Sequence, residues 1–253
     1  MRKCAAKKYR RLYNTFSSIR ESLIDILFPR RCPVCDEVLK FGAGLICPDC
    51  RKKVLRVGSV SCRKCGKRLY DESLEYCEDC KREKHYFTKA RSVFVYNDAM
   101  RNSVLRYKNH GRREYADFYA EMMEKYLGKE IKAFRADGMI AVPLTKKKLE
   151  KRGFDQAEFL AEKVSGRLGI SLYKGFLKRL KDTDEQKSLS GAERRKNLKK
   201  AFIMSRNDVK LNRVILLDDV YTTGSTADEI SVELLNAGIK SVMVVSLCSG
   251  TPI

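Results

Sequence analysis

The 253-residue chain lacks any uninterrupted apolar run of roughly 18 residues, the length at which a helix begins to span a bilayer. A secretory signal is also missing, because the basic residues at the start lead into apolar residues at helical spacing rather than into a solid apolar core. These absences predict a cytoplasmic protein without a membrane span. Residues 1–28 are predicted to form a basic amphipathic helix that packs on the protein or a partner, with a membrane surface as the less favoured alternative.

Acidic residues are few compared with basic ones. The chain has 53 Lys and Arg against 32 Asp and Glu, a formal net charge of +21. This excess favours polyanionic partners, although a solvated basic surface without nucleic-acid contact is also compatible with it. Hydrophobic residues make up 43% of the chain, which excludes a disordered protein and allows one sizeable core with a small appendage, or two modest domains.

Eight cysteines form four Cys-x-x-Cys knuckles, each starting fifteen residues after the one before. Two knuckles complete the tetrahedral sulfur site that zinc favours, so residues 29–86 are predicted to form a module with two structural zinc sites. Disulfides would need an oxidising compartment, and a redox pair or an iron–sulfur cluster would show other spacing. Pairing of successive knuckles is favoured, and a cross-braced arrangement remains open. The predicted ligands are Cys32, Cys35, Cys47, Cys50, Cys62, Cys65, Cys77 and Cys80.

Residues 87–253 alternate apolar runs with helical patterns, which predicts an α/β domain with a mostly parallel sheet. His85, just before this domain, is interpreted as a bystander rather than a ligand, and Cys248 as a small core residue. Strands are predicted at residues 91–96, 139–144, 172–180, 201–204, 214–217 and 241–247, and helices at 115–127, 155–168 and 227–237.

The most informative motif follows the apolar run 214–217. Asp218 and Asp219 are followed by a turn rich in hydroxyls, and a helix is predicted after it. Free N–H groups at a helix start suit an anion, and paired carboxylates suit ribose hydroxyls or a magnesium ion. Simple capping of the next helix is the structural alternative. The residues predicted to bind a sugar phosphate are Asp218, Asp219, Thr222, Thr223, Gly224, Ser225 and Thr226.

Two further polar segments are candidate binding loops. Residues 146–152 follow a predicted strand, and Lys146, Lys147, Lys148 and Arg152 suit a pyrophosphate group. Residues 181–200 form a long polar segment of the kind that covers binding sites. A solvated surface is the alternative for both.

The motif at 218–226 resembles the PRPP-binding motif of type I phosphoribosyltransferases. The order of all the motifs resembles the ComF (ComFC) family of bacterial competence proteins: Pro-Arg-Arg-Cys-Pro-x-Cys at 29–35, paired knuckles, Arg-Gly-Phe-x-Gln at 152–156 and Gln-x-x-Leu-Ser-x-x-Glu-Arg-Arg-x-Asn-Leu at 186–198. The resemblance runs from about residue 23 to the C-terminus. One departure is Asp155, where the family usually has Asn.

The resemblance implies a zinc module fused to a type I phosphoribosyltransferase-like domain that binds PRPP with magnesium and handles single-stranded DNA during natural transformation. A competence helicase is a possible partner in this interpretation. The alternative is an active phosphoribosyltransferase that transfers the phosphoribosyl group to an unidentified acceptor and releases pyrophosphate. Thr222 stands where guanine- and hypoxanthine-specific relatives carry an acid, which disfavours that specificity. No catalytic nucleophile can be assigned from the sequence.

Overall fold

The computed structural model describes residues 29–40, 42, 44–180, 201–205 and 210–251. The helix predicted at 1–28 and the polar segment 181–200 therefore lie outside the described residues. Within them, no helix has the length and apolar character needed to cross a membrane.

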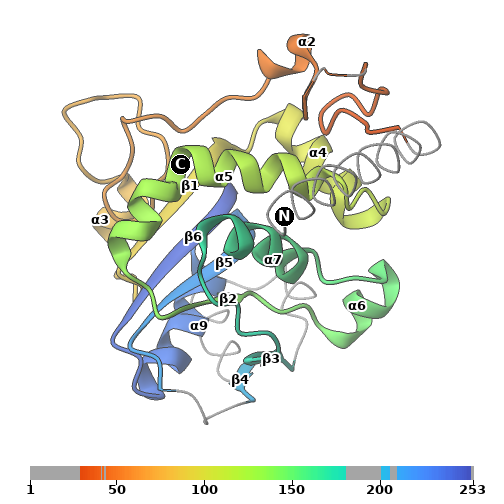
Figure 1. Ribbon diagram of the computed structural model, residues 1–253. Helices are drawn as coiled ribbons and strands as arrows, with labels where there is room; N and C mark the ends of the chain where they lie inside the picture. The colour runs from red at the N-terminus through yellow and green to blue at the C-terminus, as the bar shows by residue number, and fades with distance from the viewer. Residues whose placement is uncertain (1–28, 41, 43, 181–200, 206–209, 252–253) are drawn as a thin grey trace, which may run out of the picture.

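A four-stranded parallel sheet forms the centre of the molecule (Figure 1). Its strands lie in the order β1-β6-β5-β2, and every neighbouring pair is parallel, as predicted. A separate two-stranded antiparallel sheet pairs β3 with β4. The strands are β1 (Lys89–Val95), β2 (Gly138–Ala141), β3 (Leu177–Arg179), β4 (Phe202–Met204), β5 (Arg213–Tyr221) and β6 (Ser241–Ser249).

Helices cover both faces of the sheet because alternate residues of its buried strands point to opposite sides. Ile215 and Leu217 belong to one apolar cluster, and Val214 and Leu216 to the other. In Figure 1, α5 and α7 lie in front of the sheet and α9 lies behind it. Among its described residues, the helices of this domain are α4 (Asp98–Asn109), α5 (Tyr115–Phe134), α6 (Lys146–Arg152), α7 (Gln156–Leu168) and α9 (Ser225–Asn236).

The cysteine-rich module consists of two small ribbons that pack on different faces of the sheet. The first contains α2 (Pro48–Arg51), and its Cys32 and Cys50 join the cluster of α4, α5 and α7. The second contains α3 (Glu78–Arg82), and its Cys62 and Cys77 join the cluster of α9. Each ribbon is too small to bury much apolar surface alone. Packing on the sheet therefore adds to the folding free energy that a bound metal would supply.

Several predicted boundaries differ from the structure. Strand β5 continues through both aspartates to Tyr221, and α9 begins at Ser225, two residues before the predicted helix. The basic segment after β2 is the short helix α6 rather than an open loop, because Thr145 caps its start and Gly153 its end. The strand predicted at 172–180 is a strand only over Leu177–Arg179, with an isolated bridge at Leu172. Helix α4 was not predicted.

Candidate functional site

The eight knuckle cysteines form two compact clusters. Cys32, Cys35, Cys47 and Cys50 make one, and Cys62, Cys65, Cys77 and Cys80 make the other, with all sulfurs of a cluster within 4.8 Å of one another. This confirms pairing of successive knuckles and excludes the cross-braced arrangement. His85 belongs to neither cluster, as expected.

The sulfur geometry fits zinc. A tetrahedral site with Zn–S bonds of about 2.3 Å has sulfurs about 3.8 Å apart. The sulfurs of Cys32 and Cys35 lie 3.7 and 3.9 Å from that of Cys47, and those of Cys65 and Cys77 lie 3.5 Å apart. None of these cysteines forms a disulfide. The two clusters therefore fit two structural zinc sites.

One sulfur of each cluster has a lowered pKa, which favours the thiolate, the form in which cysteine binds zinc. Burial and neighbouring sulfurs raise the pKa values of the other cysteines for which a shift is resolved, which are Cys35, Cys50, Cys65 and Cys80. Burial raises the pKa of Cys32, but hydrogen bonds from the backbone of Cys35 and Cys47 outweigh it and bring the pKa to about 7. In the second cluster, the side chain of Cys65 is the first cause that lowers the pKa of Cys62 far below its usual range. At least one sulfur of each cluster is thus stabilised as an anion before a metal contributes.

A second candidate site is a pocket at the carboxyl edge of the sheet, where parallel strands of open α/β folds place ligands. The pocket is lined by the end of β5 and the first turn of α9. Val142, which follows β2, and Val244 of β6 complete the lining. The lining includes Asp218 and the whole stretch 220–227. The structure thus brings Asp218 and residues 222–226 together around one hollow.

Asp218 is the carboxylate of the pair that lines this pocket. Its Oδ1 accepts a hydrogen bond from the backbone N–H of Asp219 at 2.7 Å. Burial, followed by the charge of Asp219, raises the pKa of Asp218 to about 7. The side chain is therefore an acceptor that changes protonation state near neutral pH.

Asp219 turns away from the pocket into a buried polar network. Its Oδ1 lies 2.7 Å from Nζ of Lys108 on α4, and its Oδ2 accepts a hydrogen bond from Nε2 of Gln156 at 3.1 Å. Arg152 in turn donates to Oε1 of Gln156 at 2.9 Å. The charge of Asp219 is the main influence that keeps the pKa of Lys108 above its usual value against the effect of burial.

Neither Lys108 nor Gln156 was named as a partner of the aspartates in the sequence analysis. Gln156 belongs to the Arg-Gly-Phe-x-Gln motif, which could have indicated a role for its side chain. The sequence around Lys108 contains no comparable motif.

The turn that starts α9 lines the pocket. Gly224 is the N-cap residue with φ of 88°, and it makes no side-chain capping bond to the helix. The hydroxyls of Thr223 and Ser225 lie 2.9 Å apart and are exposed. The N–H of Ser225 donates to Oγ1 of Thr223 at 3.4 Å, a long hydrogen bond that a ligand could replace. Free N–H groups at a helix start can bind an anion.

The basic residues of α6 do not form a single cluster. Lys146 has 91% of its side chain exposed, and Lys147 is also exposed. Lys148 and Arg152 are half-buried, and Arg152 is connected to Asp219 through Gln156. The neighbouring Asp155 accepts from the backbone N–H groups of Leu144, Ala157 and Glu158, so its carboxylate serves as the cap of α7.

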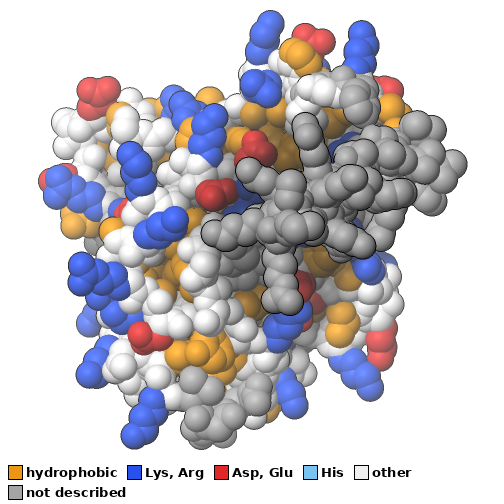
Figure 2. All heavy atoms as spheres, viewed as in Figure 1, with side chains coloured by type: hydrophobic (Ala, Val, Ile, Leu, Met, Phe, Trp, Pro, Cys, Tyr) orange, Lys and Arg blue, Asp and Glu red, His pale blue; other side chains and the backbone are white. Residues whose placement is uncertain are grey.

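Basic residues of the ribbons are candidate phosphate contacts because of their charge, but several of them have structural roles. Lys67 is 4% exposed and pairs with Asp79 at 2.7 Å, so it cannot reach a DNA backbone. Lys64 donates to two backbone carbonyls. The exposed residues Arg51, Lys52, Lys53 and Arg63 and the half-buried Arg68 remain candidates, with exposed Tyr70 and Tyr76 for base stacking. Figure 2 shows Lys and Arg side chains spread over one face of the molecule rather than gathered in one patch.

Fold and site together define a double zinc ribbon protein with an α/β domain and a pocket at the carboxyl edge of its parallel sheet. Residues 23–81 match the family model of the double zinc ribbon domain. The chain is 30% identical to Competence protein F of Haemophilus influenzae over 224 residues, covering 86% of this chain and 96% of that protein.

Two other relatives show similar coverage. Identity is 31% over 226 residues to the DNA utilization protein YhgH of Salmonella typhimurium, covering 87% of this chain and 97% of that protein. Identity to Competence protein ComFC of Streptococcus pneumoniae is 29% over 206 residues, covering 80% of this chain and 86% of that protein. The chain belongs to the ComF/ComFC/YhgH family.

Proposed function

We propose that the protein binds PRPP or a related phosphoribosyl group in the pocket between β5 and α9, and that it supports the handling of single-stranded DNA during DNA uptake. The observation that carries the first part is the convergence of Asp218 and the uncapped start of α9 on one hollow. The second part is supported by the names of the relatives, which are competence and DNA utilization proteins, and by the net charge of +21.

In the proposed complex the 5-phosphate accepts hydrogen bonds from the N–H groups of 222–226 and from the hydroxyls of Thr222, Thr223, Ser225 and Thr226. The positive end of the α9 dipole stabilises the same charge. Asp218 accepts from the ribose hydroxyls. Each Asp219 oxygen has one protein partner and can still accept another hydrogen bond, but Asp219 does not line the pocket, so it would join Asp218 only by reorienting its side chain.

The diphosphate end of PRPP would lie toward α6, where Lys148 and Arg152 are half-buried and Arg152 is connected to Asp219 through Gln156. Lys146 and Lys147 are exposed, with Lys146 3.9 Å from Glu150, and would contribute mainly to the electrostatic potential. Magnesium would bridge diphosphate oxygens and reduce their repulsion from the two aspartates.

Binding of PRPP with magnesium should raise the melting temperature of the zinc-loaded protein, since a ligand that binds only the folded state stabilises it. A concentration 100 times the dissociation constant adds about 2.7 kcal/mol to the free energy of unfolding. Asp218→Ala should remove most of this shift, and isothermal titration calorimetry gives the affinity. Lys174→Ala, a change at an exposed residue away from the pocket lining, serves as the control.

The affinity should also depend on pH. The pKa of Asp218 is about 7, and only its carboxylate form accepts from both hydroxyls of the ribose. Binding should therefore weaken as the pH falls below about 7, by up to about tenfold per unit. Asp218→Asn should bind weakly with a flatter profile. Equal affinity of the wild type and Asp218→Ala for PRPP would contradict this assignment.

Single-stranded DNA binding is expected to fall steeply with salt, because phosphate contacts release counterions. For four contacts the logarithm of the affinity should fall with the logarithm of the salt concentration with a slope of about −3. Fluorescence anisotropy with a labelled oligonucleotide measures this slope, and Arg63→Ala with Arg68→Ala should reduce it. Lys146→Ala tests whether α6 contributes. Salt-independent or undetectable binding would argue against the DNA part and leave docking to a protein, such as a competence helicase, as its replacement.

Phosphoribosyl transfer is the second candidate. It is favoured by the chain of contacts from Arg152 through Gln156 to Asp219, which joins the basic helix α6 to the residue next to Asp218. An enzyme should release pyrophosphate from PRPP when the correct acceptor is present, and Asp218→Ala should abolish that release. Binding of PRPP without release in the presence of nucleobases and oligonucleotides would favour the binding role.

A further inference from the structure

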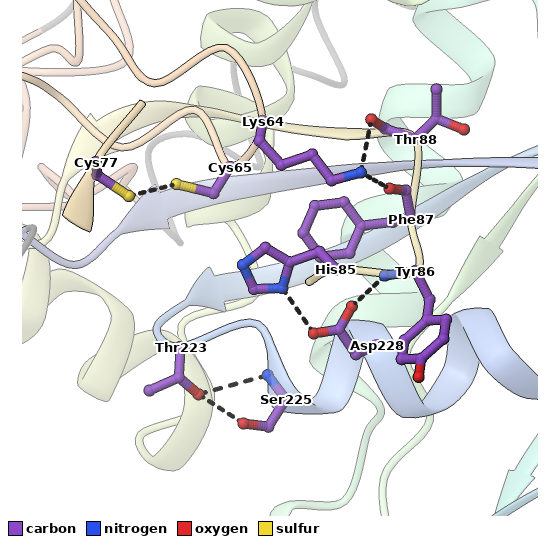
Figure 3. Close-up of polar contacts among 10 residues, drawn as sticks. All are labelled: Lys64, Cys65, Cys77, His85, Tyr86, Phe87, Thr88, Thr223, Ser225 and Asp228. Atoms are coloured by element: carbon purple, nitrogen blue, oxygen red, sulfur yellow. Dashed lines mark hydrogen bonds and ion pairs between the residues drawn. The ribbon is translucent and has the colours of Figure 1, made fainter. Parts of the chain in front are cut away.

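The segment that follows the second ribbon is fastened directly to the first turn of α9 (Figure 3). His85 has 2% of its side chain exposed, and its Nδ1 lies 2.7 Å from Oδ2 of Asp228. The backbone N–H of Tyr86 donates to the other oxygen of the same carboxylate at 2.8 Å. Asp228 in turn donates its own N–H to the carbonyl of Gly224 at 2.8 Å. His85 therefore contacts the residue that closes the turn of the phosphate loop, residues 222–226.

Phe87 makes a second connection, from the knuckle to the end of β5. Its ring is fully buried, stacks on His85 with centroids 4.8 Å apart, and meets Tyr221 edge to face at 6.0 Å. Lys64, which lies inside the Cys62 to Cys65 knuckle, donates to the carbonyl of Phe87 at 2.5 Å. The conformation of the knuckle thus fixes where Phe87 sits against β5.

Tyr221 carries this contact to the loop. A Cβ added at Gly224 would clash with the hydroxyl oxygen of Tyr221, so the Tyr221 side chain fills the space directly beside the glycine. The positive φ of Gly224 is a conformation that glycine adopts without strain. The loop is consequently held from below by Tyr221 and at its helical end by Asp228, and both residues touch the segment that follows the second ribbon.

We propose that the second ribbon positions the phosphate loop, with His85 and Phe87 as the positioning residues, so that zinc at Cys62, Cys65, Cys77 and Cys80 sets the affinity of the pocket. This inference rests on the proposed function for its ligand. The first ribbon packs on the opposite face of the sheet, so its zinc should have a smaller effect on the loop. The two zinc sites therefore have separable roles.

Two physical effects make His85 important for an anion in the loop. Its hydrogen bond holds α9 at a fixed distance from the ribbon, and donors that are already in place bind more tightly than donors that must be ordered first. It also keeps the Asp228 carboxylate turned toward the ribbon, where hydrogen-bond donors partly neutralise its negative charge. Without His85, that negative charge is less screened at the helix end where the phosphate binds.

The test compares His85→Ala and His85→Asn in the full-length, zinc-loaded protein. His85→Ala should keep two zinc ions per chain, raise amide hydrogen exchange over 222–228, and weaken the binding of magnesium PRPP by about tenfold, a usual size for coupling between sites. Asn places an amide donor near the position of Nδ1, so His85→Asn should restore much of the affinity. Binding of single-stranded DNA should stay unchanged.

Tyr119→Phe is the matched control. It removes a buried hydrogen bond of 2.6 Å between Tyr119 and Ser103 on the opposite face of the sheet, so it should lower the melting temperature without moving exchange over 222–228. The same contrast is expected between Cys77→Ser and Cys47→Ser, the equivalent knuckle positions at the starts of α3 and α2. Only Cys77→Ser should loosen the loop.

Unchanged exchange over 222–228 in His85→Ala would overturn the inference, and so would an increase spread evenly over the α/β domain. The hydrogen-exchange measurement does not depend on the ligand. If the wild type fails to bind PRPP while His85→Ala still loosens the loop, the proposed function fails and the positioning role of the ribbon stands.

Discussion

Removing zinc is expected to unfold both ribbons and to destabilise the α/β domain with them. The metal contributes an apparent folding free energy of about 10–16 kcal/mol in zinc-finger peptides. Here the clusters also belong to the two apolar cores, with Cys32 and Cys50 in one and Cys62 and Cys65 in the other. Chelation under reducing conditions should release two zinc ions per chain and lower the melting temperature by a large amount, as monitored by a metal-sensitive dye and circular dichroism.

The control for this experiment is Cys248→Ala. Cys248 is fully buried in β6 and belongs to neither sulfur cluster, so the variant should retain two zinc ions while losing only the packing of one sulfur. A protein that released its metal without a change in melting temperature would show that the ribbons fold without zinc. A stoichiometry of one would show that only one cluster binds it.

The zinc clusters were the most predictable part of the molecule. A knuckle is a local turn, and pairing each knuckle with the next closes a short loop, so sequence spacing alone carries most of the information. The sequence could not indicate which face of the sheet each ribbon would cover. That choice depends on contacts such as His85 with Asp228, which are 143 residues apart.

The parallel sheet was predictable because buried parallel strands are continuous apolar runs. The residues at which strands and helices begin and end were less predictable. Strand β5 keeps its pairing with β6 through Asp218 to Tyr221, although the apolar run stops at Leu217. Backbone hydrogen bonds extend a strand beyond the residues whose hydrophobicity identifies it. Helix α4 was not predicted because its pattern is mostly polar, with only one side buried.

The pocket was predictable as a motif but not as a set of contacts. The sequence placed Asp218 and the loop 222–226 at a strand end, and the structure brings them around one hollow. It treated Asp218 and Asp219 as equivalent. Because adjacent strand residues point to opposite faces, one carboxylate lines the pocket and the other enters the interior, where Lys108 meets it. Nothing in the sequence distinguishes Lys108 from the other 52 basic residues.

The buried pair of Lys108 and Asp219 is expected to contribute strongly to the stability of the fold. Lys108→Met should destabilise the protein by about 3–5 kcal/mol, because it leaves the Asp219 carboxylate, 7% exposed, without its cation. The remaining donor, Gln156, is neutral and supplies one hydrogen bond at 3.1 Å. Urea denaturation at pH 7.5 measures the loss. Gln156→Leu should cost less, on the order of 1–3 kcal/mol, since it removes the hydrogen bonds with Asp219 and Arg152 but keeps the ion pair.

The double variant Lys108→Met with Asp219→Asn separates the pair from its surroundings. Removing both charges eliminates the uncompensated carboxylate, so the double variant should recover a large part of the stability lost in Lys108→Met, and the cycle gives the coupling between the two side chains. If the stability losses of the two single variants simply add in the double variant, Asp219 is hydrated rather than dependent on Lys108. In that case its oxygens would be available to a ligand, and both aspartates, not Asp218 alone, would be expected to hold the ribose.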